Sequence, residues 1–296
     1  MPEAPAHTVV TDPTYGYRRL DPVPDEAELT EFYESRYYDS LRDRSRGTSL
    51  KHLLAGGEES EHERAWLRDG LYADVLAMLE RHAPGRRVLD VGAGIGEFVS
   101  AAADAGFQAS GIEPSEEAAA TARERGLEVA TTDLAGLTGA GGAFDAVVLI
   151  NVLEHVPDAA LTLRQVGALL APGGACFVQV PNDFNPLQLA AQEKLGLPSW
   201  WVAVPDHVNY FSFESLSGLA SKLGLDTVEI STDFPMEMFL LMGMDYVSDP
   251  SQGRICHGYR VEFERSVPAE TRRDLYRSFA EQGIGRQVQA LLRAGG

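Results

Sequence analysis

A glycine-rich segment, Arg87–Phe98 (RVLDVGAGIGEF), constrains the fold more than any other part of the chain. It contains a short apolar run that Asp90 interrupts, followed by glycines at positions 92, 94 and 96. Such a run is typical of a buried parallel strand, and Phe98 begins a pattern compatible with a helix. Glycines let the backbone approach a ligand closely, and a helix N-terminus offers free N–H groups. The segment therefore predicts a strand, a tight turn and a helix that together form a nucleotide-type site.

Strand and helix patterns alternate after this segment. The expected strands lie at 107–113, 127–131, 144–150, 175–181 and 224–230. The expected helices lie at 96–105, 116–126, 159–170, 212–223 and 270–281. Strands that alternate with helices of about ten residues imply a parallel sheet with right-handed crossovers. The sequence thus predicts an α/β fold, a Rossmann-like sheet with helices on both faces.

The remaining segments suggest how the chain is organised around this sheet. Residues 1–24 are polar and rich in proline, so we expect them to be extended or disordered. Helical spacing over 25–84 predicts an N-terminal helical cap. The principal domain covers 85–296, and insertions at about 182–210 and 234–283 are expected to extend the cap on one side.

Composition excludes several classes of partner. The formal net charge of −19 disfavours nucleic acid and anionic membrane, because both need a basic surface.

No apolar run reaches the length of about 18 residues that suggests a membrane span. The N-terminus lacks the basic and apolar regions of a signal peptide. Two cysteines, Cys176 and Cys256, make neither a disulfide framework nor a metal cluster. We therefore expect a cytoplasmic protein with no metal cluster. The alternative is an acceptor-bridging Mg²⁺ at the Asp/Asn loops.

The spacing of the glycine turn narrows the choice of nucleotide. The third glycine comes one residue earlier than in the dinucleotide fingerprint G-x-G-x-x-G, and no Walker lysine follows. Glu113 ends the next expected strand, where a carboxylate can accept both ribose hydroxyls. Asp133 closes the strand after that, in a position to meet an adenine amino group. Nothing in this set neutralises a pyrophosphate, so it suits a nucleoside with a cationic, zwitterionic tail.

At this point the sequence resembles the class I S-adenosyl-L-methionine (SAM)-dependent methyltransferases. The resemblance rests on VLDVGAGIGEF, GIEPS (111–115), FDAVVLINVLEHVPD (144–158) and LLAPGG (169–174). It covers about 86–230 and implies a seven-stranded sheet whose last strand, near 286–293, is antiparallel. It also implies cofactor-binding roles for Asp90, Gly92, Ala93, Gly94, Gly96, Phe98, Glu113, Pro114, Asp133, Leu134, Asn151 and Val152.

Two histidines are candidates for the acceptor side of the site. His155 follows the expected strand at 144–150, and a Glu-His pair is common there in the family, which favours a structural role. His207 begins a His-x-x-Tyr-Phe segment that is similar to one in some deoxysugar methyltransferases. That resemblance implies His207 as general base, Asp206 as its partner and Tyr210 as a positioning hydroxyl. The alternative is a histidine that binds loop backbone, and His155 remains a second catalytic candidate.

Other residues are candidates for binding the acceptor, each with a structural alternative. Asn182 and Asp183 follow the strand at 175–181, where they bind a polar acceptor or cap turns. Trp201 and Met236 belong to apolar stretches that form either a pocket wall or the core of a cap or homodimer. Tyr33 and Tyr37 belong to an aromatic cluster that either covers the ligand or packs a peripheral helix.

These expectations define one principal function and two competitors. The principal one is a SAM-dependent methyltransferase that acts on O or N of a small polar metabolite, of the sugar or secondary-metabolite type. The competitors are a NAD-dependent oxidoreductase, which requires tolerance of the early third glycine, and a SAM-binding protein without catalysis.

Overall fold

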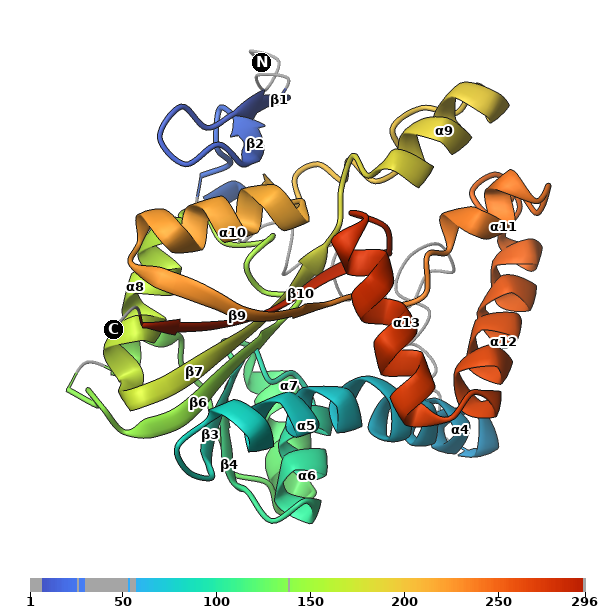
Figure 1. The fold of residues 1–296 in the computed structure, drawn as a ribbon. Coiled ribbons are helices and arrows are strands. Elements are labelled where there is room, and N and C mark those ends of the chain that lie inside the picture. Colours follow the sequence, from blue (N-terminus) through green and yellow to red (C-terminus); the bar gives the residue numbers. More distant parts are fainter. Residues whose placement is uncertain (1–6, 26, 30–52, 54–56, 138, 295–296) are drawn as a thin grey trace.

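The fold is described from a computed structural model that covers residues 7–25, 27–29, 53, 57–137 and 139–294 (Figure 1). The predicted lid residues Tyr33 and Tyr37 lie outside the described residues. No helix in the described part of the chain combines the length and the apolar character that crossing a membrane requires.

A seven-stranded sheet forms the centre of the molecule, in the order β5-β4-β3-β6-β7-β10-β9. Its strands are β3 (Arg87–Val91), β4 (Gln108–Ile112), β5 (Val129–Ala130), β6 (Phe144–Ile150), β7 (Leu170–Pro181), β9 (Leu225–Ser231) and β10 (Gln287–Ala294). Neighbouring strands from β5 to β7 are parallel, whereas β10 runs antiparallel to both β7 and β9. This confirms the α/β fold and the mostly parallel seven-stranded sheet.

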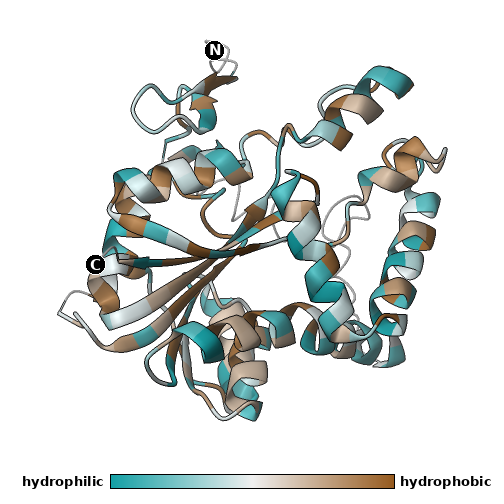
Figure 2. Ribbon diagram, in the orientation of Figure 1, coloured by the Kyte–Doolittle hydropathy of each residue, from teal (hydrophilic) through white to brown (hydrophobic). Residues whose placement is uncertain are grey.

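Helices cover both faces of the sheet (Figure 1). One face packs against α8 (Ala159–Leu169) and α10 (Phe213–Lys222), through a core that includes Leu163 and Leu219. The other face packs against α5 (Ala73–His82) and α6 (Glu97–Asp104), through Leu79 and Phe98. Because both faces are covered, the central strands are apolar along their length, as Figure 2 shows.

Local sequence explains where the main helices begin. Ser115 accepts a hydrogen bond from the Ala118 backbone N–H at the start of α7 (Glu116–Glu124). Asp158 does the same for the Leu161 N–H at the start of α8. Side-chain acceptors of this kind satisfy N–H groups that the first helical turn leaves unpaired. The two caps fix where the loops that follow β4 and β6 end. Both loops lie at the carboxyl edge of the sheet.

The N-terminal residues differ from the expected extended or disordered chain. Strands β1 (Thr8–Thr11) and β2 (Arg18–Asp21) form a hairpin, and β2 pairs antiparallel with β8 (Asn209–Tyr210). Leu20 and Tyr17 are buried, and the Tyr17 ring lies 5.1 Å from that of Phe211. The hairpin is therefore part of the structure that surrounds the 207–211 segment.

The expected helical cap and insertions form several elements. Helix α4 (Gly57–Leu67) continues through one π-helical turn, η2 (Arg68–Tyr72), into α5, which packs on the sheet itself. The insertions form α9 (Pro186–Leu195), α11 (Glu237–Leu241), α12 (Pro250–Ser266) and α13 (Ala269–Glu281). Helix α9 contacts α11, and side-chain hydrogen bonds to Glu264 join α12 to α4 and to α13. The region 234–265, which shows no clean periodicity in sequence, is thus largely helical.

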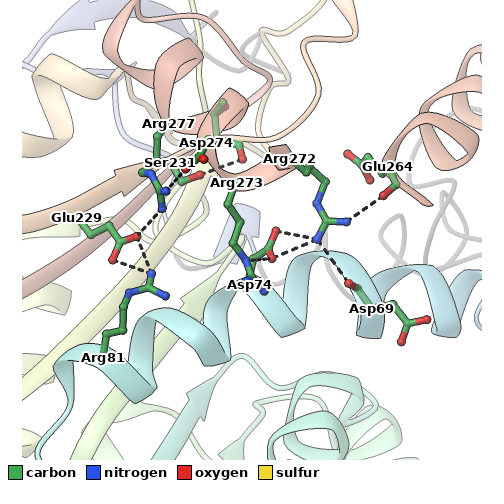
Figure 3. A network of polar contacts seen from close by, with 11 residues as sticks. Asp69, Asp74, Arg81, Glu229, Ser231, Glu264, Arg272, Arg273, Asp274 and Arg277 are labelled. Atoms are coloured by element: carbon green, nitrogen blue, oxygen red, sulfur yellow. Dashed lines mark hydrogen bonds and ion pairs between the residues drawn. The ribbon is translucent and has the colours of Figure 1, made fainter. Parts of the chain in front are cut away.

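Ion pairs bind α13 to the rest of the domain (Figure 3). Arg272 and Arg273 both donate to Asp74 of α5, at 3.1 Å and 2.6 Å from Oδ1. Glu229 of β9 accepts from Arg81 Nη2 at 2.7 Å. These contacts join α5, α13 and the sheet edge.

Replacing Gly96 with alanine is expected to lower the free energy of unfolding by about 2–4 kcal/mol. Gly96 has φ +81°, and an added Cβ meets Leu127 Cδ1 at 2.5 Å. Gly126 is the matched control, because it has φ +79° but no heavy atom within 4 Å of an added Cβ. Gly126→Ala is expected to cost only the backbone strain, about 1–2 kcal/mol. Equal losses for the two variants in urea unfolding would show that packing at Gly96 is not tight.

Candidate functional site

The glycine turn connects β3 to α6 at the carboxyl edge of the sheet. Gly92, Gly94 and Gly96 all have positive φ angles, which favour glycine. The N–H groups of Gly92 and Ala93 donate to the carbonyl oxygen of Ile112, which ties the turn to the end of β4. An added Cβ at Gly94 meets no atom within 4 Å, so the backbone there faces open space. The turn therefore leaves room for a ligand against its main chain.

Glu113 follows β4 directly and reaches back to this turn. Its Oε2 accepts from the Gly94 N–H at 2.9 Å, and its Oε1 accepts from the Ser115 N–H at 2.9 Å. The carboxylate is half-buried and fixed by these two bonds. Each carboxylate oxygen has a further lone pair, so two hydroxyl groups of a ligand can still donate to it.

Asp90 lies inside the end of β3, where it is buried. Burial raises the pKa of Asp90 well above its usual value, and the nearby charge of Glu113 raises it further. A cationic ligand group beside Asp90 would favour the ionised carboxylate instead. Phe98 packs against Tyr72, with ring centroids 5.6 Å apart, in the core beneath the turn. The structure therefore shows Phe98 in the core that supports this side of the site.

The other predicted cofactor residues line the same edge of the sheet. Asp133 is exposed and accepts from the Gly136 N–H at 3.1 Å, within the short helix η3 (Leu134–Leu137). Asn151 has φ +56°, a conformation that few residues other than glycine adopt, and its N–H donates to the Gln179 carbonyl. Val152 packs against Gly92, since an added Cβ there would lie 2.8 Å from Val152 Cγ2. Pro114 is exposed beside Glu113.

The two candidate histidines lie next to each other, with ring centroids 5.0 Å apart. The turn after β6 and the segment before β8 are held together by main-chain bonds, because the N–H groups of Val208 and Asn209 both donate to the Glu154 carbonyl. Asp206 contacts His155: its carbonyl oxygen lies 2.8 Å from Nδ1 and its Oδ1 lies 3.2 Å from the same atom. Asp206, the predicted partner of His207, thus contacts His155, and the Glu-His pair belongs to the same cluster.

Charges inside this cluster shift one another's protonation. Burial raises the pKa of Glu154, whose side chain is almost wholly enclosed, while His155 opposes this shift. Burial opposes the charge on His155, but Glu154 and Asp206 outweigh it and raise the pKa of that imidazole. Without a bound cation, these charges favour the protonated form of His155, which cannot accept a further proton. Of the two histidines, this leaves His207 as the candidate base.

Asn182 and Asp183 follow β7 and lie side by side in different surroundings. The Asn182 side-chain nitrogen donates to the carbonyl oxygens of Gly283 and Gly285, so it fixes the turn before β10. Asp183 is buried, and burial together with the charges of Glu154 and Glu237 raises its pKa well above the usual value. The geometry favours a structural role for Asn182. Asp183, in contrast, interacts electrostatically with Glu154 of the histidine cluster.

A pocket of about 380 Å³ adjoins these residues. Asp183 and Tyr210 contribute to its wall, and its other sides come from the hairpin and the start of α10, including Arg18 and Glu214. The Arg18 guanidinium lies over the Phe184 ring, 4.1 Å from the centroid. This volume is within the range of small-molecule pockets.

The apolar candidates Trp201 and Met236 are both buried. Trp201 lies edge-on to Phe184, with centroids 5.4 Å apart, and so adjoins the residue that follows Asp183. Met236 packs with Phe239 and Cys256 in a small core of the insertions. This packing favours the cap-core alternative for Met236 and a position near the acceptor side for Trp201.

Arg286 is a functional candidate that sequence reasoning missed. Its positive charge opposes the rise that burial causes in the pKa of Asp183, Asp233 and Glu237. It precedes β10, which runs antiparallel, and its carbonyl oxygen accepts from the Asn182 N–H. The start of an antiparallel strand lies at the same edge as the ends of its parallel neighbours. The expected antiparallel direction of the last strand could therefore have indicated that Arg286 lies at this edge of the sheet.

Comparison with known proteins identifies the family. A family model described as "Methyltransferase domain" matches residues 62–230. Because the match covers more than half of the chain, this protein belongs to the methyltransferase-domain family. Together with the fold and the glycine turn, the match identifies a SAM-dependent methyltransferase domain of class I, with SAM as its cofactor.

Named relatives agree with this assignment. A ubiquinone biosynthesis O-methyltransferase from Bordetella avium is 36% identical over 137 residues, which cover 43% of this chain and 56% of the relative. One from Aromatoleum aromaticum is 32% identical over 169 residues, which cover 52% and 71%. The chain spans about half the length of most of the curated relatives it matches.

Solved structures agree on the fold. Magnesium protoporphyrin IX methyltransferase from Synechocystis, solved with bound S-adenosylhomocysteine (SAH), superposes with a TM-score of 0.53 at 15% identity and covers 92% of this chain and 100% of its own. A SAM-dependent methyltransferase from Archaeoglobus fulgidus gives 0.51 at 17% identity, over 76% of this chain and 94% of its own.

The residues around the glycine turn fit SAM. The open backbone at Gly94 offers contact area, Glu113 has lone pairs for two ribose hydroxyls, and buried Asp90 suits a cationic amino acid group. These features fit the cofactor-binding roles that the resemblance implies for Asp90, Gly94 and Glu113, and these roles stay predictions.

Replacing Glu113 with glutamine is expected to weaken SAH binding by about tenfold. The amide keeps one oxygen, so one of the N–H groups of Gly94 and Ser115 loses its acceptor and faces a donor instead. Titration calorimetry measures the change, with Glu117→Gln on exposed α7 as the control. Equal affinity for SAH in the two variants would exclude Glu113 from the cofactor site.

Proposed function

We propose that this protein transfers the methyl group of SAM to an oxygen or nitrogen atom of a small polar acceptor. One observation carries the proposal. The glycine turn and the cluster of His155, Asp206 and His207 lie on loops at the same edge of one sheet. Cofactor and acceptor groups placed there can meet without a large movement of the chain.

The pocket beside Asp183 and Tyr210 supports the size and polarity of the acceptor. Acidic Asp183 and Glu214 lie in its wall with Arg18, so it suits a ligand with hydroxyl or amino groups. The relatives are named O-methyltransferases, which favours oxygen as the atom that is methylated. Among polar metabolites, we propose a hydroxylated one of the sugar or secondary-metabolite type.

The residues of this chain have three tasks in the proposed reaction. When bound, SAM supplies a sulfonium methyl group that a nucleophile can displace, which releases SAH. Glu113 and the glycine turn hold the cofactor, and the pocket wall positions the acceptor. His207 takes the proton that the acceptor loses as its new bond to carbon forms. Tyr210 and Asp183 adjoin this position and are proposed to orient the acceptor.

The test is methyl transfer by the full chain from methyl-labelled SAM to a panel of hydroxylated sugars, phenols and amines. We expect acceptor-dependent formation of SAH, with the label recovered in one product class. Tight binding of SAH without turnover across the panel would contradict the proposal and favour a SAM-binding protein without catalysis.

A further inference from the structure

Three side chains at the acceptor side bring metal-ligand atoms together. One carboxylate oxygen of Glu154 and one ring nitrogen each of His155 and His207 lie within 4.8 Å of one another. Bonds of about 2.0–2.2 Å to a central ion place such atoms roughly 3–4 Å apart, so a small contraction completes the site. Hydrogen bonds between the two loops hold this arrangement in place. The Asn209 side-chain nitrogen donates to the carbonyl oxygens of Leu153 and Val156, at 3.0 Å and 2.7 Å.

The orientation of His155 is that of a metal ligand. Its Nδ1 lies 2.8 Å from the carbonyl oxygen of Asp206, which can only accept a hydrogen bond, so Nδ1 carries a proton. The other nitrogen, Nε2, faces Glu154 with 3.7 Å to Oε1. Histidines that bind metals commonly donate their second ring nitrogen to a carbonyl or carboxylate, which fixes the ring and the tautomer. Asp206 provides both kinds of acceptor.

The balance of charge and hydrogen bonds also favours a cation. Glu154 has 1% of its surface exposed, and its Oε2 is buried without a hydrogen-bond partner. Asp183 and Asp206 add two more carboxyl groups near it. A buried carboxylate oxygen without a donor is costly, and an ion between Glu154 and the imidazoles would satisfy it.

We infer that Glu154, His155 and His207 bind one divalent transition-metal ion beside the acceptor pocket. Two imidazoles and one carboxylate suit ions such as Zn²⁺, Mn²⁺ or Co²⁺ better than Mg²⁺, which prefers oxygen ligands. Three protein ligands leave coordination positions open for an acceptor oxygen. The catalytic use of the ion rests on the proposed function, whereas its binding does not. With His207 as a ligand, the bound ion would lower the pKa of the acceptor hydroxyl, and water would take the proton that the hydroxyl loses.

Cobalt titration of the tag-free, chelator-treated full chain tests the inference. One equivalent of Co²⁺ is expected to produce visible d–d absorption, and Glu154→Gln, His155→Ala and His207→Ala are each expected to weaken binding by about tenfold or more. The matched control is His62→Ala, because His62 is exposed on α4. Asp206→Asn tests the positioning of His155 and is expected to weaken binding by about 10–100-fold.

Binding of SAH is measured on every variant, so that a folding defect is separated from loss of a ligand. No cobalt absorption, or absorption that is unchanged in all three ligand variants, would overturn the inference. Methyl transfer is assayed separately with and without the ion. A failure of the proposed function would therefore appear as cobalt binding without turnover.

Discussion

Replacing His207 with alanine is expected to slow methyl transfer by about 100-fold or more, while the affinity for SAH stays within about twofold. The ring of His207 lies 5.0 Å from that of His155 and 6.3 Å from that of Tyr210, on the acceptor side of the site. The proposed cofactor contacts come from Glu113 and the glycine turn, on loops that follow β4 and β3. Single-turnover rates at saturating SAM measure the effect on the transfer step.

Controls on His207 separate its proposed roles. His62→Ala is expected to match the wild-type rate, since His62 is exposed on α4. If His207 is a general base, chelator treatment leaves the wild-type rate unchanged; if it is a ligand, chelation slows the wild-type enzyme as much as the substitution does. Unchanged turnover in His207→Ala would contradict both roles.

Replacing Glu264 with alanine is expected to lower the free energy of unfolding by about 3–5 kcal/mol. Glu264 of α12 is buried, and it binds side chains of α4 and α13. It accepts hydrogen bonds from Trp66 Nε1 at 2.6 Å, Tyr276 Oη at 2.7 Å and Arg260 Nε at 3.1 Å. Burial alone would raise the pKa of Glu264, but Arg260 and these hydrogen bonds outweigh it and hold the pKa below its usual range. Its removal leaves the buried Arg260 charge with Asp233 as its remaining ion-pair partner.

Urea unfolding measures the free energy lost in Glu264→Ala, and two other variants serve as comparisons. Glu262→Ala is the matched control, because Glu262 is exposed on the same helix, and its cost is expected to stay within about 0.5 kcal/mol. Glu264→Gln keeps the shape but not the charge, so an intermediate loss is expected. A loss for Glu264→Ala that equals that of Glu262→Ala would show that the buried network contributes little to stability.

The sequence predicted the elements whose determinants are local. The apolar run and glycines at 87–98 predicted β3, the turn and α6, and the helix expected at 116–126 begins as α7 after the Ser115 cap. The antiparallel last strand was also predicted, but through the family resemblance and not through its own weak alternation. For β3, the turn, α6 and α7, the residues that fix the element are neighbours in the chain.

Contacts between distant segments could not be predicted in this way. The N-terminal hairpin is held by pairing of β2 with β8, nearly two hundred residues away along the chain. The contacts of His155 with Asp206 and of Trp66 with Glu264 also join segments that are far apart in the chain. The family resemblance located the two histidines on separate loops, yet only the fold shows that Glu154, His155 and His207 form one cluster. The acceptor side of the site consists mainly of such long-range contacts, which is why its residues were predicted less completely than those of the cofactor side.

Titration calorimetry of the full chain with SAH tests the central claim most directly. We predict one binding site per chain with a dissociation constant in the micromolar range, about −8 kcal/mol, and no measurable heat with NAD⁺. Loss of affinity in Glu113→Gln but not in Glu117→Gln would locate the ligand at the glycine turn. Absence of binding by both SAM and SAH, or tight binding of NAD⁺ in their place, would contradict the account.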